Sequence, residues 1–172
     1  GGAGRYDSAI ARLTPSGQLD SSYASGGMLT LQASAGSNEA SAVALDSSGR
    51  LLLAGAASDR DGPLAYVARL NPNGTPDASF GSAGVRRLRA SDFGPGVNNL
   101  QFSAIAVGSI NGNGYRIFAG GTSINGNGKL LATLVALDES GAPVSSYANG
   151  GMARLDPPAS PATSIRGLYY GE

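Results

Sequence analysis

Short apolar runs separated by glycine-rich turns recur along the whole chain. In "RLLLAGAA", "AVAL" and "LLATLVAL", apolar residues occupy both alternating positions rather than one. A strand with one wet face would alternate apolar and polar residues, so these runs predict strands that are covered on both faces. Because no helical pattern is present to cover them, we expect small sheets that stack against one another.

A seven-residue phrase marks three repeats of this pattern. "SYASGGM" at 22–28 returns as "SFGSAGV" at 79–85 and as "SYANGGM" at 146–152. The flanking segments align in the same order, with 163–171 matching only weakly, so tandem repeats are indicated. We therefore expect one array over 1–172, made of repeat 1 (5–62), repeat 2 (63–128) and an incomplete repeat 3 (129–172).

Each complete repeat predicts four short strands. In repeat 1 they fall at about 8–13, 27–32, 40–46 and 50–57, separated by turn sequences such as "TPSG" and "DSSG". The segment 129–138 has helical propensity, but its alignment with the other repeats predicts a strand. The expected fold is all-β, a β-propeller-like array of four-stranded antiparallel blades in an incomplete ring. Repeat 3 is expected to supply three of its four strands. A β-sandwich is the alternative.

The repeat sequence resembles a known family. "ARLNPNGTPDASFGSAGV" and the segment type "ASAVALDSSGRLLLAGAA" are similar to the delta-60 repeat, a bacterial propeller-like repeat of largely unassigned function. Tyr23 and Tyr147 depart from the usual Phe of that family, and Ser48 stands where Asp is common. The resemblance implies tandem repeats in exported or surface proteins of bacteria, and it implies no catalytic residues.

Six repeat positions are expected to be structural. An aromatic residue at one place in each repeat would fill the seam between neighbouring blades, and a following glycine would allow the chain to turn. A ring of aromatics for ligand stacking is the competing interpretation. These positions are Tyr23, Phe80 and Tyr147, followed by Gly27, Gly84 and Gly151.

Two pairs of opposite charge recur at the same spacing. Arg12 precedes Asp20, and Arg69 precedes Asp77, by the same number of residues, whereas repeat 3 has Ala136 and Val144 at these positions. Charges that disappear together predict an ion pair that ties a hairpin, because one partner alone would leave a partly buried charge unpaired.

Composition excludes several classes of function. The 12 basic and 12 acidic residues cancel, which argues against nucleic-acid binding, and no run reaches the roughly 20 apolar residues of a membrane span. The chain contains neither histidine nor cysteine, so imidazole bases, thiolate nucleophiles and the usual zinc sites are excluded. We expect no cofactor. The expected partners are neighbouring repeats or a second copy of the chain that completes the ring.

Candidate chemical sites are few. Asp59 and Asp61 form a fragment of a calcium-loop pattern, a weak metal candidate that lacks the remaining ligands of an EF-hand. The motif "SINGNG" at 109–114 and 123–128 suits hairpin turns, and its Asn side chains are a candidate for calcium or sugar. The irregular segment 90–101 is the expected place for a binding surface.

The sequence therefore favours a non-enzymatic repeat module that acts as a scaffold or as a surface for a protein or ligand. A calcium- or carbohydrate-binding adhesion module is one alternative, and a carboxylate-based glycoside-active enzyme is another. From the family resemblance we expect the protein to be extracellular, periplasmic or on the cell surface.

Overall fold

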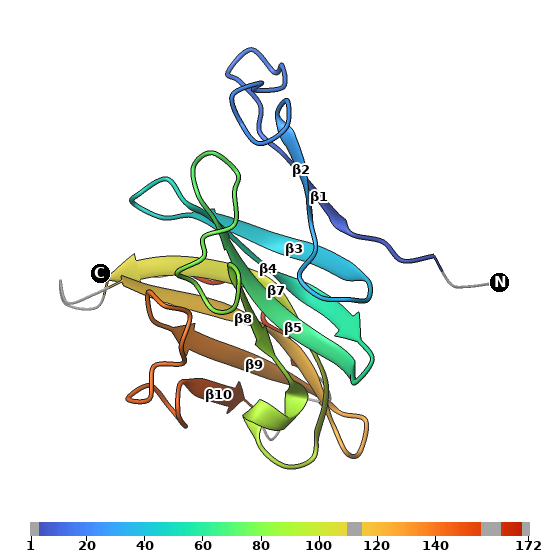
Figure 1. The fold of residues 1–172 in the computed structure, drawn as a ribbon. Coiled ribbons are helices and arrows are strands. Elements are labelled where there is room, and N and C mark those ends of the chain that lie inside the picture. Colours follow the sequence, from blue (N-terminus) through green and yellow to red (C-terminus); the bar gives the residue numbers. More distant parts are fainter. Residues whose placement is uncertain (1–3, 110–114, 156–162, 170–172) are drawn as a thin grey trace.

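Three antiparallel sheets make up the described part of the molecule (Figure 1). The computed structural model describes residues 4–109, 115–155 and 163–169. A half-sheet pairs β1 (Ser8–Ala11) with β2 (Met28–Leu31). The first full sheet has the order β3 (Asn38–Leu45), β4 (Leu51–Asp59), β5 (Gly62–Leu70) and β6 (Val85–Leu88). The second full sheet has the order β7 (Val97–Ser109), β8 (Tyr115–Asn125), β9 (Leu130–Leu137) and β10 (Met152–Leu155).

The expected all-β fold with four-stranded antiparallel sheets is confirmed, and the described residues do not close a ring. The four strands expected in repeat 1 are present, each within a few residues of its expected bounds. The segment 129–138 is the strand β9 rather than a helix, because pairing with both β8 and β10 outweighs its helical propensity.

Stacking of the sheets buries two apolar cores. The first full sheet packs with one face on the second full sheet and with part of the other on the half-sheet. β4 and β5 are covered on both faces, as their sequences predicted, whereas β3 leaves Val43 and Leu45 of "AVAL" exposed because the half-sheet does not reach them. We call the contact between the half-sheet and the first full sheet seam 1, and the contact between the two full sheets seam 2. Seam 2 contains Leu52, Val67, Phe102, Ile117 and Val135.

The sheets do not coincide with the sequence repeats. We expected the four strands of one repeat to form one blade, but β1 and β2 pair with each other while β3 and β4 join β5 and β6. Each repeat therefore gives its first two strands to one sheet and its last two strands to the next. The reason is the hairpin that joins β4 to β5 across the repeat boundary, where pairing is continuous from Leu51↔Leu70 to Asp59↔Gly62.

The described residues of repeat 3 form fewer strands than expected. They form β9 and β10, whereas residues 163–169 form no strand. The first strand of a sheet pairs only with the second, as β3 does with β4, and among the described residues no second strand is available to 163–169. This segment instead lies on the outer face of the second full sheet, where Ile165 N donates to Gly121 O at 3.2 Å.

The segment 90–101 is not the wholly irregular loop that its composition predicted. It contains a short 3₁₀ helix, η1 (Ala90–Phe93), and then the start of β7. Phe93, Val97 and Leu100 are all buried in the core of seam 2. These apolar side chains fill the space between two sheets and hold the segment in place. Its polar and turn residues remain exposed, so a binding surface here stays a prediction; the exposed residues are Ser91, Asp92, Pro95, Gly96, Asn98, Asn99 and Gln101.

Candidate functional site at the seams between sheets

Arg69 ties repeat 2 to repeat 3 at seam 2. Its Nε donates to Asp77 Oδ2 at 2.8 Å, and its Nη1 donates to the backbone carbonyl of Glu139 at 2.7 Å. The guanidinium also lies over the ring of Phe80, 4.7 Å from the centroid. The Arg69 side chain is fully buried, so these contacts replace the water that it loses on folding.

The same contacts occur at seam 1 with the residues of repeat 1. Arg12 Nε donates to Asp20 Oδ2 at 2.9 Å, and Arg12 Nη1 donates to the Pro72 carbonyl at 2.7 Å. Its guanidinium lies 4.5 Å from the ring centroid of Tyr23. We call this set of an arginine, an aspartate and an aromatic residue the clamp. The structure thus brings together both charge pairs that the sequence singled out.

Each clamp holds a tight turn of the following repeat. These acceptor turns are 71–74 and 138–141, and both end at a glycine with positive φ. A Cβ at Gly74 would lie 3.1 Å from Cζ of Tyr23, and one at Gly141 would lie 2.9 Å from the ring of Phe80. Only glycine allows the turn to approach the aromatic ring so closely.

The glycine of the repeated phrase shapes the clamp from the other side. Gly27, Gly84 and Gly151 all have positive φ, and each donates its N–H to the carbonyl of the preceding aromatic residue at 2.7–3.0 Å. Their carbonyls accept from the backbone N–H of residues 12, 69 and 136, at the end of the adjoining strand. A single bend of the chain therefore sets the aromatic ring beside the strand that carries the arginine.

The clamp carboxylates are held in the ionised form. Burial of Asp77 opposes ionisation, but hydrogen bonds from Ser79 and the charge of Arg69 outweigh it and lower the pKa below the ordinary value. The pKa of Asp20 is also lowered, mainly by hydrogen bonds from Ser22 and then by Arg12. Both carboxylates accept hydrogen bonds from an arginine and a serine of their own repeat and favour the ionised form, and this makes them poor candidates for general acids.

Repeat 3 keeps the aromatic residue of the clamp and lacks its charges. Tyr147 packs edge-on against Phe118 of its own sheet, with ring centroids 5.6 Å apart. Ala136 and Val144 stand where the other repeats have Arg and Asp. Tyr147 is half-buried, whereas Tyr23 and Phe80 are buried at their seams.

A second charged group at seam 2 was missed by the sequence analysis. Arg50 Nε donates to Asp46 Oδ2 at 2.6 Å. Arg50 Nη1 lies 3.6 Å from Asp77 Oδ2, and Arg50 Nη2 lies 3.4 Å from Glu139 Oε1. The hydroxyl of Tyr115 donates to Asp46 Oδ2 at 3.1 Å. Burial raises the pKa of Tyr115 to about 12, and the Asp46 charge adds to this rise. The turn sequence "DSSGR" was the available signal, since its Asp is placed to accept from the Arg that follows.

The weak metal candidates face an arginine. Arg89 Nη2 donates to Asp59 Oδ2 at 2.6 Å and lies 3.6 Å from Asp61 Oδ2. A guanidinium between the two carboxylates supplies the positive charge that a calcium ion would otherwise provide. Within residues 4–109, 115–155 and 163–169, no three side chains of Asp, Glu, His or Cys gather as metal ligands.

The first Asn of the second "SINGNG" motif, Asn125, is engaged by its own turn. Asn125 Oδ1 accepts from the backbone N–H groups of Asn127 at 3.0 Å and Lys129 at 2.8 Å. This use of the side chain stabilises the hairpin between β8 and β9 and occupies the atom that would bind calcium or sugar. The turn of the first motif, at residues 110–114, lies outside the described residues.

In the part of the chain that the structure describes, no helix has the length and apolar character to cross a bilayer.

Comparison with known proteins supports the propeller-like interpretation. A family model described as "Domain of unknown function (DUF5122) beta-propeller" matches residues 1–23 and 47–80, less than half of the chain. These stretches include Arg12, Tyr23, Arg69 and Phe80, which build the two clamps. No curated protein and no solved structure matches the chain. The chain is thus similar to a family of β-propeller repeats whose function is unknown.

Proposed function

We propose that this chain is a non-enzymatic repeat module whose role is to hold stacked sheets in a fixed order, as a scaffold or as a surface for partner proteins. The observation that carries the proposal is the repetition of the clamp. Seam 1 and seam 2 share the arginine–aspartate bond, the arginine–carbonyl bond and the ring above a glycine turn. A contact set that repeats from one unit to the next favours assembly over chemistry at any one unit.

The buried charges support the same role. At seam 2 the two arginines Arg50 and Arg69 are matched by Asp46 and Asp77, and each arginine bonds its own carboxylate. A glycoside hydrolase needs two carboxyl groups that face a common space, one of them free to be protonated. The lowered pKa values of Asp46 and Asp77 disfavour the protonated form, so this cluster is better suited to joining sheets.

The delta-60 resemblance supports a place for the module in an exported or surface protein of a bacterium. Detection of the protein by antibody in culture medium, cell-surface and cytoplasmic fractions of the source cells tests this location. Recovery in the cytoplasmic fraction alone would contradict it.

A ligand screen tests the functional proposal against its two alternatives. We expect calcium or a panel of soluble glycans to leave the thermal midpoint of the folded chain unchanged, because a ligand that binds only the native state would raise it. We also expect no hydrolysis of the same glycans. A saturable rise with calcium that is lost in the Asp59→Asn variant would establish the adhesion module instead, and hydrolysis lost in Asp46→Asn would establish the enzyme.

A further inference from the structure

One turn of the same kind as the two acceptor turns is not held by any clamp. Residues 14–17 form the same turn as 71–74 and 138–141: Gly17 N donates to Thr14 O at 2.9 Å, as Gly74 N donates to Asn71 O and Gly141 N to Asp138 O. The terminal glycines have φ of 81°, 87° and 81°. Gly74 and Gly141 are each covered by an aromatic ring, whereas nothing lies within 4 Å of a Cβ built at Gly17.

Apolar side chains of the first full sheet are exposed where their counterparts are covered. Val43 and Leu45 are 63% and 67% exposed. Their equivalents in the second full sheet are Ile105, only 9% exposed, and Val107, which packs against the core of seam 2. The half-sheet covers only part of the first full sheet, because it has the third and fourth strands of a blade and not the first and second.

The edge of β1 is open in the same region. Its counterparts β5 and β9 each pair with a strand on both sides, whereas β1 pairs only with β2. Figure 1 shows the half-sheet standing apart from the two full sheets at its far end. An open edge beside exposed apolar residues is a docking surface for a further strand.

We propose that these three features are one docking surface, and that its occupant is another repeat unit of the same class that carries a complete clamp. This inference rests on the proposed scaffold function and names its partner. The first two strands of such a unit would bring an arginine and an aromatic ring to the 14–17 turn. Its last two strands would pair with β1 and cover Val43 and Leu45. Repeat 2 makes this same double contact with repeat 3.

A second copy of this chain fits the surface less well. The unit that a second copy would present from its exposed end is repeat 3, whose clamp positions are Ala136 and Val144. Without the arginine, the carbonyl of Pro15 would receive no guanidinium like those that Pro72 and Glu139 accept. The chemistry of the surface therefore selects a clamp-bearing unit over repeat 3 of another copy.

The test extends the full chain by one clamp-bearing unit. Residues 5–61 are duplicated ahead of residue 5, which joins the two copies in the register of the natural β4–β5 hairpin. The chain has no cysteine, so a thiol introduced by Leu45→Cys in the original repeat reports its exposure through alkylation. We expect alkylation at least about tenfold slower in the extended chain than in the parent, with amide exchange in Ser8–Ala11 slowed as well.

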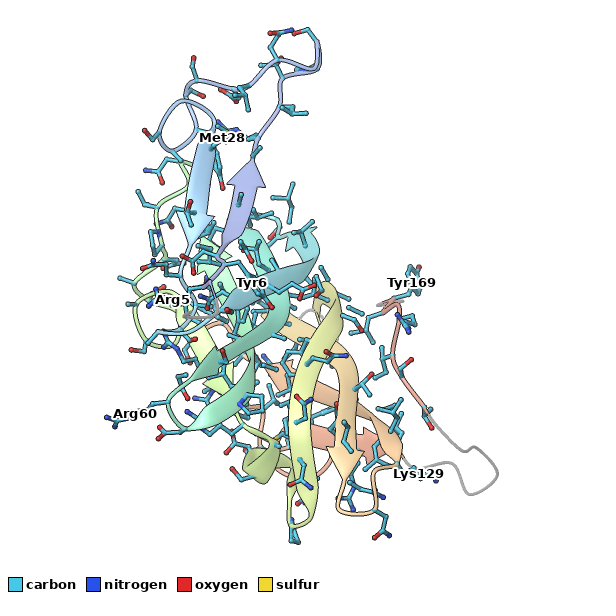
Figure 2. The ribbon with its side chains drawn as sticks, turned by 90° about the vertical axis from the view of Figure 1, so that its right-hand side faces the viewer. Arg5, Tyr6, Met28, Arg60, Lys129 and Tyr169 are labelled. Carbon is cyan, nitrogen blue, oxygen red and sulfur yellow. The ribbon has the colours of Figure 1, made fainter. Side chains whose placement is uncertain are left out.

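Matched variants in the added unit separate clamp docking from mere chain extension. Arg12→Ala in the added unit should restore much of the alkylation rate, whereas Arg60→Ala should not. The Arg60 side chain projects into solvent from the tip of its hairpin (Figure 2) and is 92% exposed. If the cysteine variant does not fold, amide hydrogen exchange at β1 in chains without the introduced thiol gives the same comparison between the Arg12→Ala and Arg60→Ala variants.

Three results would overturn the inference. They are equal alkylation and exchange rates in parent and extended chains, an added unit that prevents folding, and a parent chain that dimerises and thereby protects the thiol at position 45. In all three cases the scaffold function survives if the parent's own seam 2 still depends on Arg69. The scaffold function fails separately, if Arg69→Ala leaves the stability of the parent unchanged.

Discussion

Arg69 and Arg12 make the same bonds in different surroundings. The Arg69 side chain has no exposed surface, whereas that of Arg12 is 39% exposed. Water can therefore reach the guanidinium of Arg12 and replace its partners, but it cannot reach the guanidinium of Arg69. The two clamps therefore have the same geometry, but the buried clamp of Arg69 contributes more to the free energy of unfolding than the exposed clamp of Arg12.

We predict that Arg69→Ala lowers the free energy of unfolding by about 3 kcal/mol, because the buried Asp77 loses its hydrogen-bonded cation and keeps only Arg50, 3.6 Å away. Arg12→Ala should cost much less. Urea denaturation of both variants gives the comparison, with Arg60→Ala as the exposed control.

A double-mutant cycle isolates the pair itself. Arg69→Ala should cost less in an Asp77→Ala background than in the parent, because the partner charge has already gone. Additive losses would contradict the pairing between the two residues.

The two buried carboxylates of seam 2, Asp46 and Asp77, also predict how stability varies with pH. Folding lowers the pKa of Asp46 and Asp77, so both favour the ionised form in the folded state. Their contribution is complete above the ordinary aspartate pKa of about 4 and is lost as the pH falls through the lower folded values. We expect the urea midpoint to decrease below about pH 4, with a shallower decrease in Asp77→Asn. An Asp77→Asn profile that falls as steeply as the parent's would refute this assignment.

At the scale of the elements, the bend after each aromatic residue depends on glycine for two reasons. Gly84 has φ of 85°, and a Cβ there would lie 2.9 Å from Cβ of Pro76. Gly96 has φ of 74°, but a Cβ there would meet nothing within 4 Å. The two residues share the backbone strain of an L side chain and differ in the clash.

We predict that Gly96→Ala costs about 1 kcal/mol, the strain of a left-handed conformation, and that Gly84→Ala costs at least about twice as much. Thermal unfolding of the two variants measures the difference. Equal losses would mean that the strand pair beside Gly84 relaxes without cost.

The sequence predicted the strands well because their signals are local. Apolar residues on both faces and the repeated phrase placed β1 to β4 within a few residues. The sequence also predicted the ion pairs Arg12–Asp20 and Arg69–Asp77, because repeats 1 and 2 have both charges and repeat 3 has neither. It did not predict the Arg50 group, which joins Asp46 of repeat 1 to Tyr115 of repeat 2 and has no copy to compare with.

At the scale of the molecule, nothing in the sequence pattern shows how the repeats divide between sheets. A repeat has no marked start, and only pairing across the β4–β5 hairpin shows that blades begin at the third predicted strand. The segment 90–101 was misread for a similar reason. Its glycines and polar residues indicated a loop, whereas Phe93 and Leu100 are held by a sheet that is distant in sequence.

The stack also predicts a gradient of local stability. In the first full sheet, β4 and β5 are packed on both faces, while β1 and β2 have one partner strand each and one packed face. We expect amide hydrogen exchange to be fastest in β1 and β2 and slowest in β4 and β5. Native-state exchange followed by mass spectrometry measures this order. Uniform protection in all strands would show that the molecule opens only as a whole.

The offset between repeats and sheets has a mechanical consequence. Adjacent repeats share a sheet, because the boundary between them falls in the middle of that sheet. Tension between two repeats is therefore borne by the β4–β5 or β8–β9 ladder rather than by the softer apolar contact between sheets. A fibre or stalk built this way would stretch only by tearing rows of backbone hydrogen bonds.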